Sequence, residues 1–409
     1  MSPAPNSSFA ALRYRDFRLL WLGLIVSVTG SQMQFVAINW HVYLLTKSPL
    51  ALGLIGAFRA VPIIVCSLAG GVVADALDRK KLLVVTQLVM LSSAALLAMF
   101  TFAGLKSVWP IYVLSGLASA ASAFDTPARQ SLMPLLVPAE VFPNAVSLGI
   151  LVFNVSTIVG PALGGFILAE SGPALIYGLN ALSFVAVIVA LLLMKTSGDP
   201  ERDANSGSAL SFGALKEGLR FVWNTPIIVQ TMTLDFAATF FASATLLLPI
   251  FASERLHVDA RGYGLLAAAP AIGSVITALV MARMGSFSKQ GRLVVVSVAI
   301  FGLATAAFGV STVFWFSLMM LAVTGAADTV STVLRQTIRQ LVTPNQLRGR
   351  MTSINMMFFM GGPQLGELEA GLLAAVIGAP LSVVIGGLGS IVSAAVAALK
   401  SRSLMDFEV

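Results

Sequence analysis

The stretch PALIYGLNALSFVAVIVALLLM (173–194) contains no charged residue and is long enough to cross a lipid bilayer as one helix. Similar apolar runs recur from one end of the chain to the other. Hydrophobic residues make up 57% of the 409 residues and charged residues only 11%, whereas soluble domains carry roughly 25% charged residues. Because a segment in lipid must satisfy its own backbone hydrogen bonds, this composition predicts an all-α membrane protein.

Hydropathy predicts twelve transmembrane helices. They cover residues 17–45, 50–74, 82–104, 108–127, 145–169, 173–194, 226–251, 263–283, 292–312, 314–335, 352–377 and 381–399. The first run is too long for the apolar core of a signal peptide, so we interpret it as a retained span.

Basic residues predict the orientation of the chain. If the N-terminus is cytoplasmic, the inside segments hold 20 of the 25 lysines and arginines, the outside segments hold four, and Arg59 alone lies in the membrane. This positive-inside bias predicts that both termini are cytoplasmic. The formal charge of +7 therefore reflects topology, and nucleic acid is not an expected partner.

A polar stretch from Lys195 to Ser211 is rich in glycine, serine, proline and asparagine and reads as a linker. We predict a first six-helix bundle at 1–195, a cytoplasmic linker at 196–212 and a second six-helix bundle at 213–409. The segment 209–223 places leucines among charged residues, which is typical of a helix lying in the membrane interface.

The two predicted bundles resemble each other in sequence. SPLALGLIGA (48–57) matches DARGYGLLAA (259–268) at an offset of 211, and RQSLMPLLVP (129–138) matches RQTIRQLVTP (335–344) at an offset of 206. Chance similarity between apolar helices does not account for the shared Arg-Gln pair and loop proline. The pattern predicts parallel repeats related by pseudo-symmetry, which in transporters flank a central site.

Between the second and third spans, GGVVADALDRKKL (70–82) combines a glycine with charges of both signs. Gly71 permits close helix packing, and Asp75, Asp78, Arg79 and Lys80 can form ionic contacts that exist in one conformation and break in another. We predict that these charged residues act as a gate. The alternative is a positive stop that only fixes topology.

In the fifth span, STIVGPALGGF (156–166) has small residues at helical spacing. Gly160, Gly164 and Gly165 would allow a neighbouring helix to approach closely, and Pro161 removes one backbone hydrogen bond. We predict that these four residues serve helix packing.

These strings resemble the major facilitator superfamily. The loop is similar to its signature G-x-x-x-D-x-x-G-R-[RK], with Asp78 in place of a glycine, and the fifth span is similar to its exporter motif, with Ser156 in place of the first glycine. Further strings, namely FDTPARQ (124–130), LDFAATFF (234–241), TPNQLRGRM (343–351) and QLGELEAGLLAA (364–375), resemble the branch of transmembrane secretion effectors, which includes the enterobactin exporter and bacterial drug exporters. The resemblance implies two pseudo-symmetric six-helix bundles and alternating-access export.

Ionisable residues inside spans cost about 2.5–3.5 kcal/mol each on insertion scales, so each requires a partner, a cavity or a function. Asp125 precedes Arg129 by one helical turn, which favours a local pair. Asp328 lies two turns before Arg335 and either pairs with it or takes part in transport. Both readings stay open for Asp328.

Arg59 lies about 13 Å from the outer end of the second span, and Glu367 and Glu369 lie about 15 and 12 Å from that of the eleventh. The resemblance implies that these two helices face each other. We therefore predict that Arg59 pairs with Glu367 or Glu369 when the outer side is closed, with Glu367 also a candidate for coupling.

Asp235 is the main predicted site for a proton or a cationic substrate. It lies about 14 Å from the start of the seventh span, near the membrane midplane, with no basic residue within two turns along the chain. The resemblance implies that this helix lines the central cavity. The alternative is a carboxyl that hydrogen-bonds Thr231, Thr233 or Thr239 and only stabilises packing.

We find no sign of an enzyme, a cofactor or a metal site. The chain has one cysteine, Cys66, two separated histidines, His41 and His257, and no phosphate-binding loop. His41 follows Trp40 and is either a proton sensor or an interfacial anchor. We expect a monomeric secondary transporter that exports amphipathic small molecules, of drug or siderophore type, in exchange for protons. An importer, a lipid flippase and a non-transporting scaffold or sensor are the alternatives.

Overall fold

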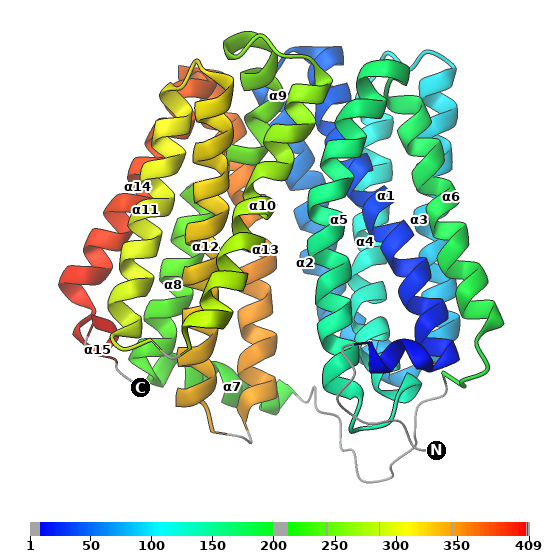
Figure 1. The fold of residues 1–409 in the computed structure, drawn as a ribbon, viewed down its shortest axis with the longest axis horizontal. Coiled ribbons are helices and arrows are strands. Elements are labelled where there is room, and N and C mark those ends of the chain that lie inside the picture. The colour runs from blue at the N-terminus through cyan, green and yellow to red at the C-terminus, as the bar shows by residue number, and fades with distance from the viewer. Residues whose placement is uncertain are drawn as a thin grey trace. The chain divides into compact units, whose positions relative to one another are not determined.

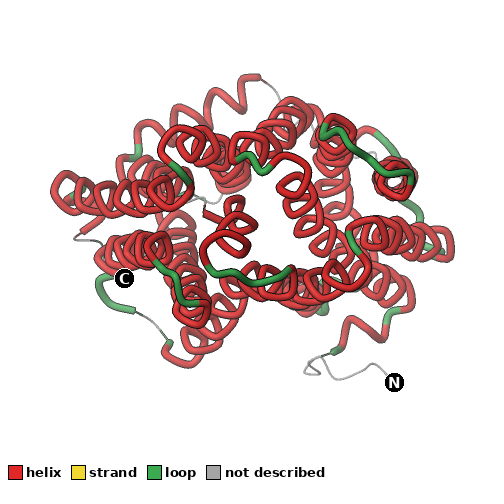
Figure 2. Tube along the Cα trace, turned by 90° about the horizontal axis from the view of Figure 1, so that it is seen from above, coloured by secondary structure: helices red, strands yellow, loops and turns green. Residues whose placement is uncertain are grey.

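The computed structural model describes residues 9–198, 212–241, 244–285, 287–344, 347–405 and 407. These residues form helices joined by short loops and contain no strand (Figure 2). The longer helices are α1 (Arg15–Thr46), α2 (Pro49–Ala76), α3 (Arg79–Phe102), α4 (Trp109–Leu132), α5 (Phe142–Ser171), α6 (Pro173–Leu193), α7 (Phe212–Asn224), α8 (Pro226–Phe241), α10 (Ala260–Met284), α11 (Gln290–Val310), α12 (Phe314–Val342), α13 (Arg348–Ile377) and α14 (Ala379–Lys400). The shorter elements are η1 (Ala10–Arg13), η2 (Met133–Leu136), η3 (Ala244–Leu247), α9 (Leu248–Ile250), the π-helix η4 (Phe251–Arg255) and α15 (Arg402–Met405).

Within the described residues, ten helical segments are long and apolar enough to cross a membrane. They are Arg15–Thr46, Pro49–Cys66, Arg79–Phe102, Phe142–Ser171, Pro173–Leu193, Pro226–Arg255, Ala260–Met284, Gln290–Val310, Phe314–Val342 and Ala379–Lys400. The chain is therefore an all-helical, multi-pass membrane protein. The predicted total of twelve spans is not established by this finding.

The chain divides into two compact units inside the predicted linker, between residues 203 and 204. Two short segments are exchanged: residues 47–57 at the start of α2 belong to the second unit, and residues 260–264 at the start of α10 belong to the first. In the first unit, α1 packs on α5 and α6, and α3 packs on α4 and α6 (Figure 1).

The second unit repeats this packing order. Here α8 packs on α13 and α14, and α11 packs on α12 and α14 (Figure 1). With α8 as the first helix of its set, the pairs are first with fifth, first with sixth, third with fourth and third with sixth, as in the first unit. The shared order supports the internal repeat that the matched strings indicate. The predicted boundaries 1–195 and 213–409 remain predictions.

At two helix crossings, a glycine of one helix faces a glycine of the other. A Cβ on Gly53 would lie 2.9 Å from the Gly371 Cα, and a Cβ on Gly165 would lie 2.7 Å from the Gly264 Cα. Real Cβ atoms essentially never come within 3.0 Å of such an atom. The offsets of the repeat, 211 and 206, relate Gly53 to Gly264 and Gly165 to Gly371, so both crossings use repeat-related positions.

Two helical boundaries differ from those predicted. The tenth span was expected to end at residue 335, but α12 continues to Val342 and carries Arg335 and Arg339 inside the helix. The seventh span was expected to end at residue 251, but the apolar helical segment runs over Pro226–Arg255 and ends in the π-helix. Hydropathy marks where a helix is apolar, and it misses a helix that continues with buried charged residues.

The Gly165 crossing gives a stability prediction. Gly165→Ala places a methyl group against the backbone of Gly264, so we expect it to destabilise the protein by about 1–3 kcal/mol and to lower its melting temperature in detergent. The matched control is Gly178→Ala on α6, where a Cβ meets nothing within 4 Å and the melting temperature should stay the same or rise slightly. A Gly165→Ala protein as stable as the wild type would refute the tight crossing.

Candidate functional site

A cluster of buried charges joins α8 and α12 in the second unit. The Nη2 atom of Arg335 lies 2.8 Å from Asp235 Oδ1, and the Nη2 atom of Arg339 lies 3.8 Å from Asp235 Oδ2. The side chains of Arg335, Arg339 and Asp235 are 1%, 4% and 6% exposed. The two arginines reach one carboxylate because residues four apart share a helix face.

Asp328 is the fourth charged member of the cluster and the only one that is widely exposed. Its Oδ1 lies 3.8 Å from the same Arg335 Nη2 that binds Asp235, and its side chain is 49% exposed. Thr332 bridges the two residues: its hydroxyl donates to Asp328 Oδ1 at 3.4 Å and accepts from Arg335 Nη2 at 3.0 Å. The Nη2 atom of Arg335 therefore contacts two carboxylates, that of buried Asp235 and that of half-exposed Asp328.

The charges in this cluster balance only when Asp328 is counted. Guanidinium groups stay protonated in proteins, so Arg335 and Arg339 contribute two positive charges against the single negative charge of buried Asp235. Ionised Asp328 brings the sum to zero. A proton or a cation that arrives at Asp328 therefore leaves one buried positive charge without compensation, and this imbalance can drive a rearrangement.

Arg339 extends the cluster to a third helix. Its Nη1 donates to the side-chain oxygen of Asn355 on α13, and its Nε donates to the backbone oxygen of Arg335 at 3.2 Å. The cluster thus joins α8, α12 and α13, so a change in its charge reaches three helices of the unit.

No basic residue lies within two turns of Asp235 along the chain, but the fold brings it two cationic partners from α12, a hundred residues further on. The alternative hydrogen bonds to threonine are not found among the described residues either: Thr231 and Thr239 donate to the backbone oxygens of Ile228 and Asp235. The sequence analysis named Arg335 only as a partner of Asp328, and it missed both the contact of Arg335 with Asp235 and the part of Arg339 in the cluster. Their spacing of four residues in RQTIRQ was the available signal.

The predicted local pair in the first unit is confirmed. Arg129 donates to Asp125 Oδ2, and Thr86 and Gln87 donate to Asp125 Oδ1 at 3.1 and 2.8 Å. Asp125 is 1% exposed. Because both oxygens are occupied by donors and the group is buried, this carboxylate is a structural element of α3 and α4.

The loop between α2 and α3, which resembles the superfamily signature, leads into α3 and forms hydrogen bonds with residues that follow α6. Asp78 caps α3, since its Oδ1 accepts from the backbone N–H groups of Lys80 and Lys81 at 2.9 and 3.2 Å. Lys80 Nζ donates to the Met194 oxygen at 2.7 Å, and the backbone N–H of Arg79 donates to the Gly198 oxygen at 2.9 Å. The side chain of Asp75 lies outside the described residues, and the gating role of Asp75, Asp78, Arg79 and Lys80 stays a prediction.

The two glutamates of α13 face different surroundings. A Cβ on Gly56 of α2 would lie 3.1 Å from Glu367 Oε2, so Glu367 lies beside α2. Glu369 follows by two residues, which is about 200° around a helix, and lines a groove between α13 and the end of α8. The guanidinium of Arg59 lies 4.8 Å from the ring centre of Phe35. Its pairing with Glu367 or Glu369 would join different units and remains a prediction.

The glycines of the fifth span are packed as their spacing indicates. A Cβ on Gly160 would meet the Thr29 oxygen at 3.0 Å, and one on Gly164 would meet the Met33 Cα at 3.1 Å, so both lie against α1. Pro161 lies inside α5, and its oxygen is 2.6 Å from a Cβ built on Gly264. This face of α5 therefore contacts α1 on one side and the start of α10 on the other.

His41 is a buried residue, 6% exposed, and its Nδ1 lies 3.1 Å from the hydroxyl of Tyr177. Among the residues that the structure describes, no three histidine, cysteine, aspartate or glutamate side chains come together in a group that could hold a metal ion. The candidate site is therefore the charged cluster of α8 and α12.

The cap formed by Asp78 gives a graded prediction. Asp78→Ala removes the acceptor of two backbone donors and should destabilise the protein by about 1 kcal/mol, whereas Asp78→Gly should cost only a few tenths of that because glycine is itself a good capping residue. Thermal unfolding in detergent measures both. Equal losses for alanine and glycine would contradict the capping role. Because glycine is a better N-cap residue than alanine, it can take the place of aspartate at this position, where the signature pattern has a glycine.

The charged cluster predicts unequal effects of its two aspartates. Asp235→Asn leaves two buried arginines short of a partner and should destabilise the protein by about 3–5 kcal/mol. Asp328→Asn should cost about 1 kcal/mol or less, since its contact with Arg335 is long and exposed. Each variant replaces one aspartate by asparagine and so removes one negative charge. Comparing their melting temperatures therefore separates the effect of position from the effect of charge. A more stable Asp235→Asn variant would overturn this description of the cluster.

Comparisons with known proteins agree with this architecture. The family model for transmembrane secretion effectors matches residues 6–408. The enterobactin exporter EntS of Salmonella typhimurium is 26% identical over 377 residues, with 92% of this chain and 90% of the relative covered. The multidrug efflux pump Tap of Mycolicibacterium fortuitum is 26% identical, with 87% and 88% covered.

Solved structures show a similar fold. A bacterial homologue of the human lysosomal transporter Spinster, inward-facing and unoccupied, has a TM-score of 0.75 at 14% identity, with 96% of this chain and 98% of that chain covered. A D-xylose–proton symporter has a TM-score of 0.70 at 13% identity, with 94% and 98% covered. At this level of identity the likeness concerns the fold alone.

Proposed function

Because the chain belongs to the transmembrane secretion effector family of the major facilitator superfamily, we propose that it exports amphipathic small molecules across the bacterial inner membrane. The chain is not an enzyme, since its family and the solved structures that share its fold are membrane transporters. The observation that carries the proposal is the single Arg335 nitrogen shared between buried Asp235 and exposed Asp328.

The proposed architecture has twelve spans in two six-helix bundles. The 24-residue α4 and the 30-residue α13 would join the ten apolar segments, because about 20 residues suffice to cross the bilayer. Both termini would then lie in the cytoplasm, as the basic residues indicate, and the protein would act as a monomer. Alternating access would expose the charged cluster to each side of the membrane in turn.

In the proposed coupling step, a proton binds Asp328. The proton neutralises the Asp328 carboxylate, which both Arg335 and Thr332 contact. Asp235 is then the one ionised carboxylate left beside Arg335 in the cluster. The cluster then carries one excess positive charge, which favours a conformation where water or an incoming group compensates it. Asp328 suits this role better than Asp235, because a proton at Asp235 would compete with two arginines in a buried site.

A proton gradient supplies enough energy for this transport. A proton that crosses a potential of 100 mV releases about 2.3 kcal/mol, which corresponds to an accumulation of nearly fifty-fold per charge. The names of the relatives, an enterobactin exporter and a multidrug efflux pump, favour substrates that are drug-like or siderophore-like.

The gates of the proposed cycle lie at the two ends of α2. We infer from their similar depths in the predicted spans that Arg59 binds Glu367 or Glu369 when the outer side is closed. At the other end, Asp75 and Arg79 would form contacts that hold the cytoplasmic side closed. Arg79 Nε is buried and has no hydrogen-bond partner among the described residues, which leaves a donor for such a contact.

Transport by purified protein in vesicles tests the coupling role. With an imposed pH gradient, Asp328→Asn should abolish uphill movement of a cationic dye such as ethidium or of a catecholate siderophore, while exchange without a gradient continues. Asp328→Glu should keep part of the driven transport. The control is Glu140→Gln, which removes a carboxylate from an exposed turn far along the chain from the cluster.

Three outcomes would contradict the proposal. Full gradient-driven transport by Asp328→Asn would remove Asp328 from the mechanism. Net movement of both compounds only into the cytoplasmic side would favour an importer. Absence of any gradient-driven movement in the wild type, for these compounds and for labelled phospholipid, would favour a scaffold or sensor.

A further inference from the structure

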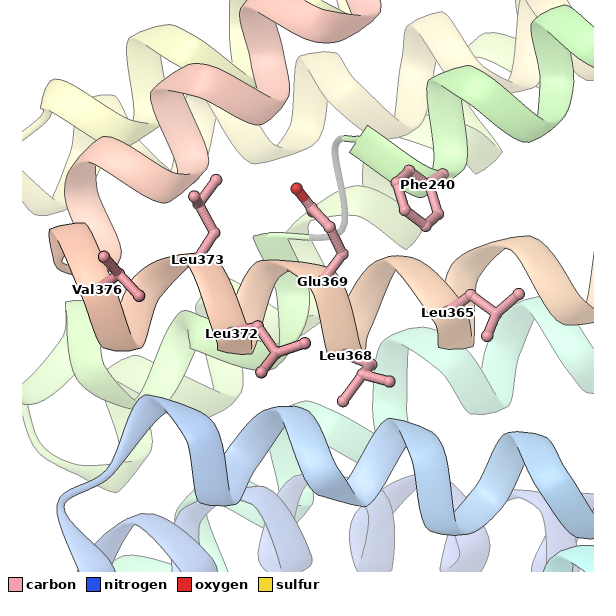
Figure 3. A pocket seen from close by; sticks show the side chains of 7 residues that line it. All are labelled: Phe240, Leu365, Leu368, Glu369, Leu372, Leu373 and Val376. Carbon is pink, nitrogen blue, oxygen red and sulfur yellow. The ribbon is translucent and has the colours of Figure 1, made fainter.

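A groove of about 500 Å³ in the second unit has an apolar lining with a single carboxylate (Figure 3). It is lined by Phe240 at the end of α8 and by the α13 residues Leu365, Leu368, Glu369, Leu372, Leu373 and Val376. Val376 is 83% exposed and Leu372 is 50% exposed, so the groove is open along one side. Its volume lies within the range of about 300–1,000 Å³ that is typical of small-molecule sites.

Glu369 is the one charged group of this lining, and within the described part of the chain it has no hydrogen bond or ion pair. Figure 3 shows its side chain on the same side of α13 as Leu373 and Phe240, while Leu368 and Leu372 point to the other side. An ionisable residue inside a span usually has a partner or faces a ligand path. Since the described residues supply no partner here, we take the carboxylate to be available to a ligand.

We propose that this groove binds an amphipathic cation, with its ammonium group at Glu369 and its apolar body against the leucines of α13. The only formal charge in the lining is negative, so a cation is attracted and an anion is repelled. Phe240 also lines the groove, and an aromatic ring is a further group that can attract a cation. The inference rests on the proposed export function, because it names a class of compound that the protein would carry.

The test measures the binding of two fluorescent dyes to the full chain in phosphatidylcholine nanodiscs. The two dyes share the same apolar body and differ in one charged group. Trimethylammonium-diphenylhexatriene carries a fixed positive charge, and diphenylhexatriene is its neutral parent. Glu369→Gln should weaken binding of the charged dye about ten-fold or more, in line with the loss of a charged contact, and should leave binding of the neutral dye unchanged. Glu140→Gln, which removes an exposed carboxylate elsewhere, should bind both dyes as the wild type does.

Glu369→Asp keeps the charge and should retain most of the binding of the charged dye, with a melting temperature like that of the wild type. Equal affinity of wild type and Glu369→Gln for the charged dye would overturn the proposal, as would a wild type that binds both dyes equally. If phosphatidylethanolamine in the nanodisc displaces the dye from the wild type but not from Glu369→Gln, the groove belongs to a lipid amine and the proposal fails.

The binding result is separable from the proposed transport. Binding of the charged dye at Glu369 without pH-driven movement in vesicles would leave the groove intact and count against proton-coupled export. Driven movement of a siderophore without binding of the dye at Glu369 would support export and overturn the groove as a cation site.

Discussion

A charge among apolar helices must be balanced close by, and this requirement organises the second unit. Arg335 is 1% exposed and keeps its proton, so the fold has to bring a carboxylate to it. The carboxylate comes from α8, and the neighbouring Arg339 needs both that group and Asn355 of α13. The contacts of these two arginines thus join three helices, α8, α12 and α13. A change in the charge of the cluster would therefore alter the contacts among all three.

The two units treat the same repeated arginine differently. Arg129 and Arg335 stand at matching places in the repeat, but Arg129 binds an aspartate of its own helix that is also held by Thr86 and Gln87. Arg335 divides one nitrogen between aspartates of two helices, and one of these is exposed. The first arrangement is a saturated, buried pair, whereas the second joins a short buried contact of 2.8 Å to a longer one of 3.8 Å with a half-exposed carboxylate. The cluster of the second unit therefore has an accessible carboxylate that the pair of the first unit lacks.

Long apolar runs with few charges could be predicted from sequence, because hydropathy over about 20 residues reports the need to satisfy the backbone in lipid. The pair of Asp125 and Arg129 could be predicted because both lie on one helix. The partners of Asp235 could not, since they depend on how α8 packs on α12 and on an α12 that continues past its apolar part. Side-chain partners between helices are a property of packing, which a linear pattern does not contain.

The glycine pairs restrict how this chain can evolve. Most tight contacts in proteins tolerate drift, because a side chain that grows on one helix can be accommodated by one that shrinks on the other. At Gly53 with Gly371, and at Gly165 with Gly264, both positions already have the smallest possible side chain. No single compensating substitution exists, so a larger residue at either position forces the two backbones apart. Such crossings should persist in descendants of this sequence even where the surrounding apolar residues are freely exchanged.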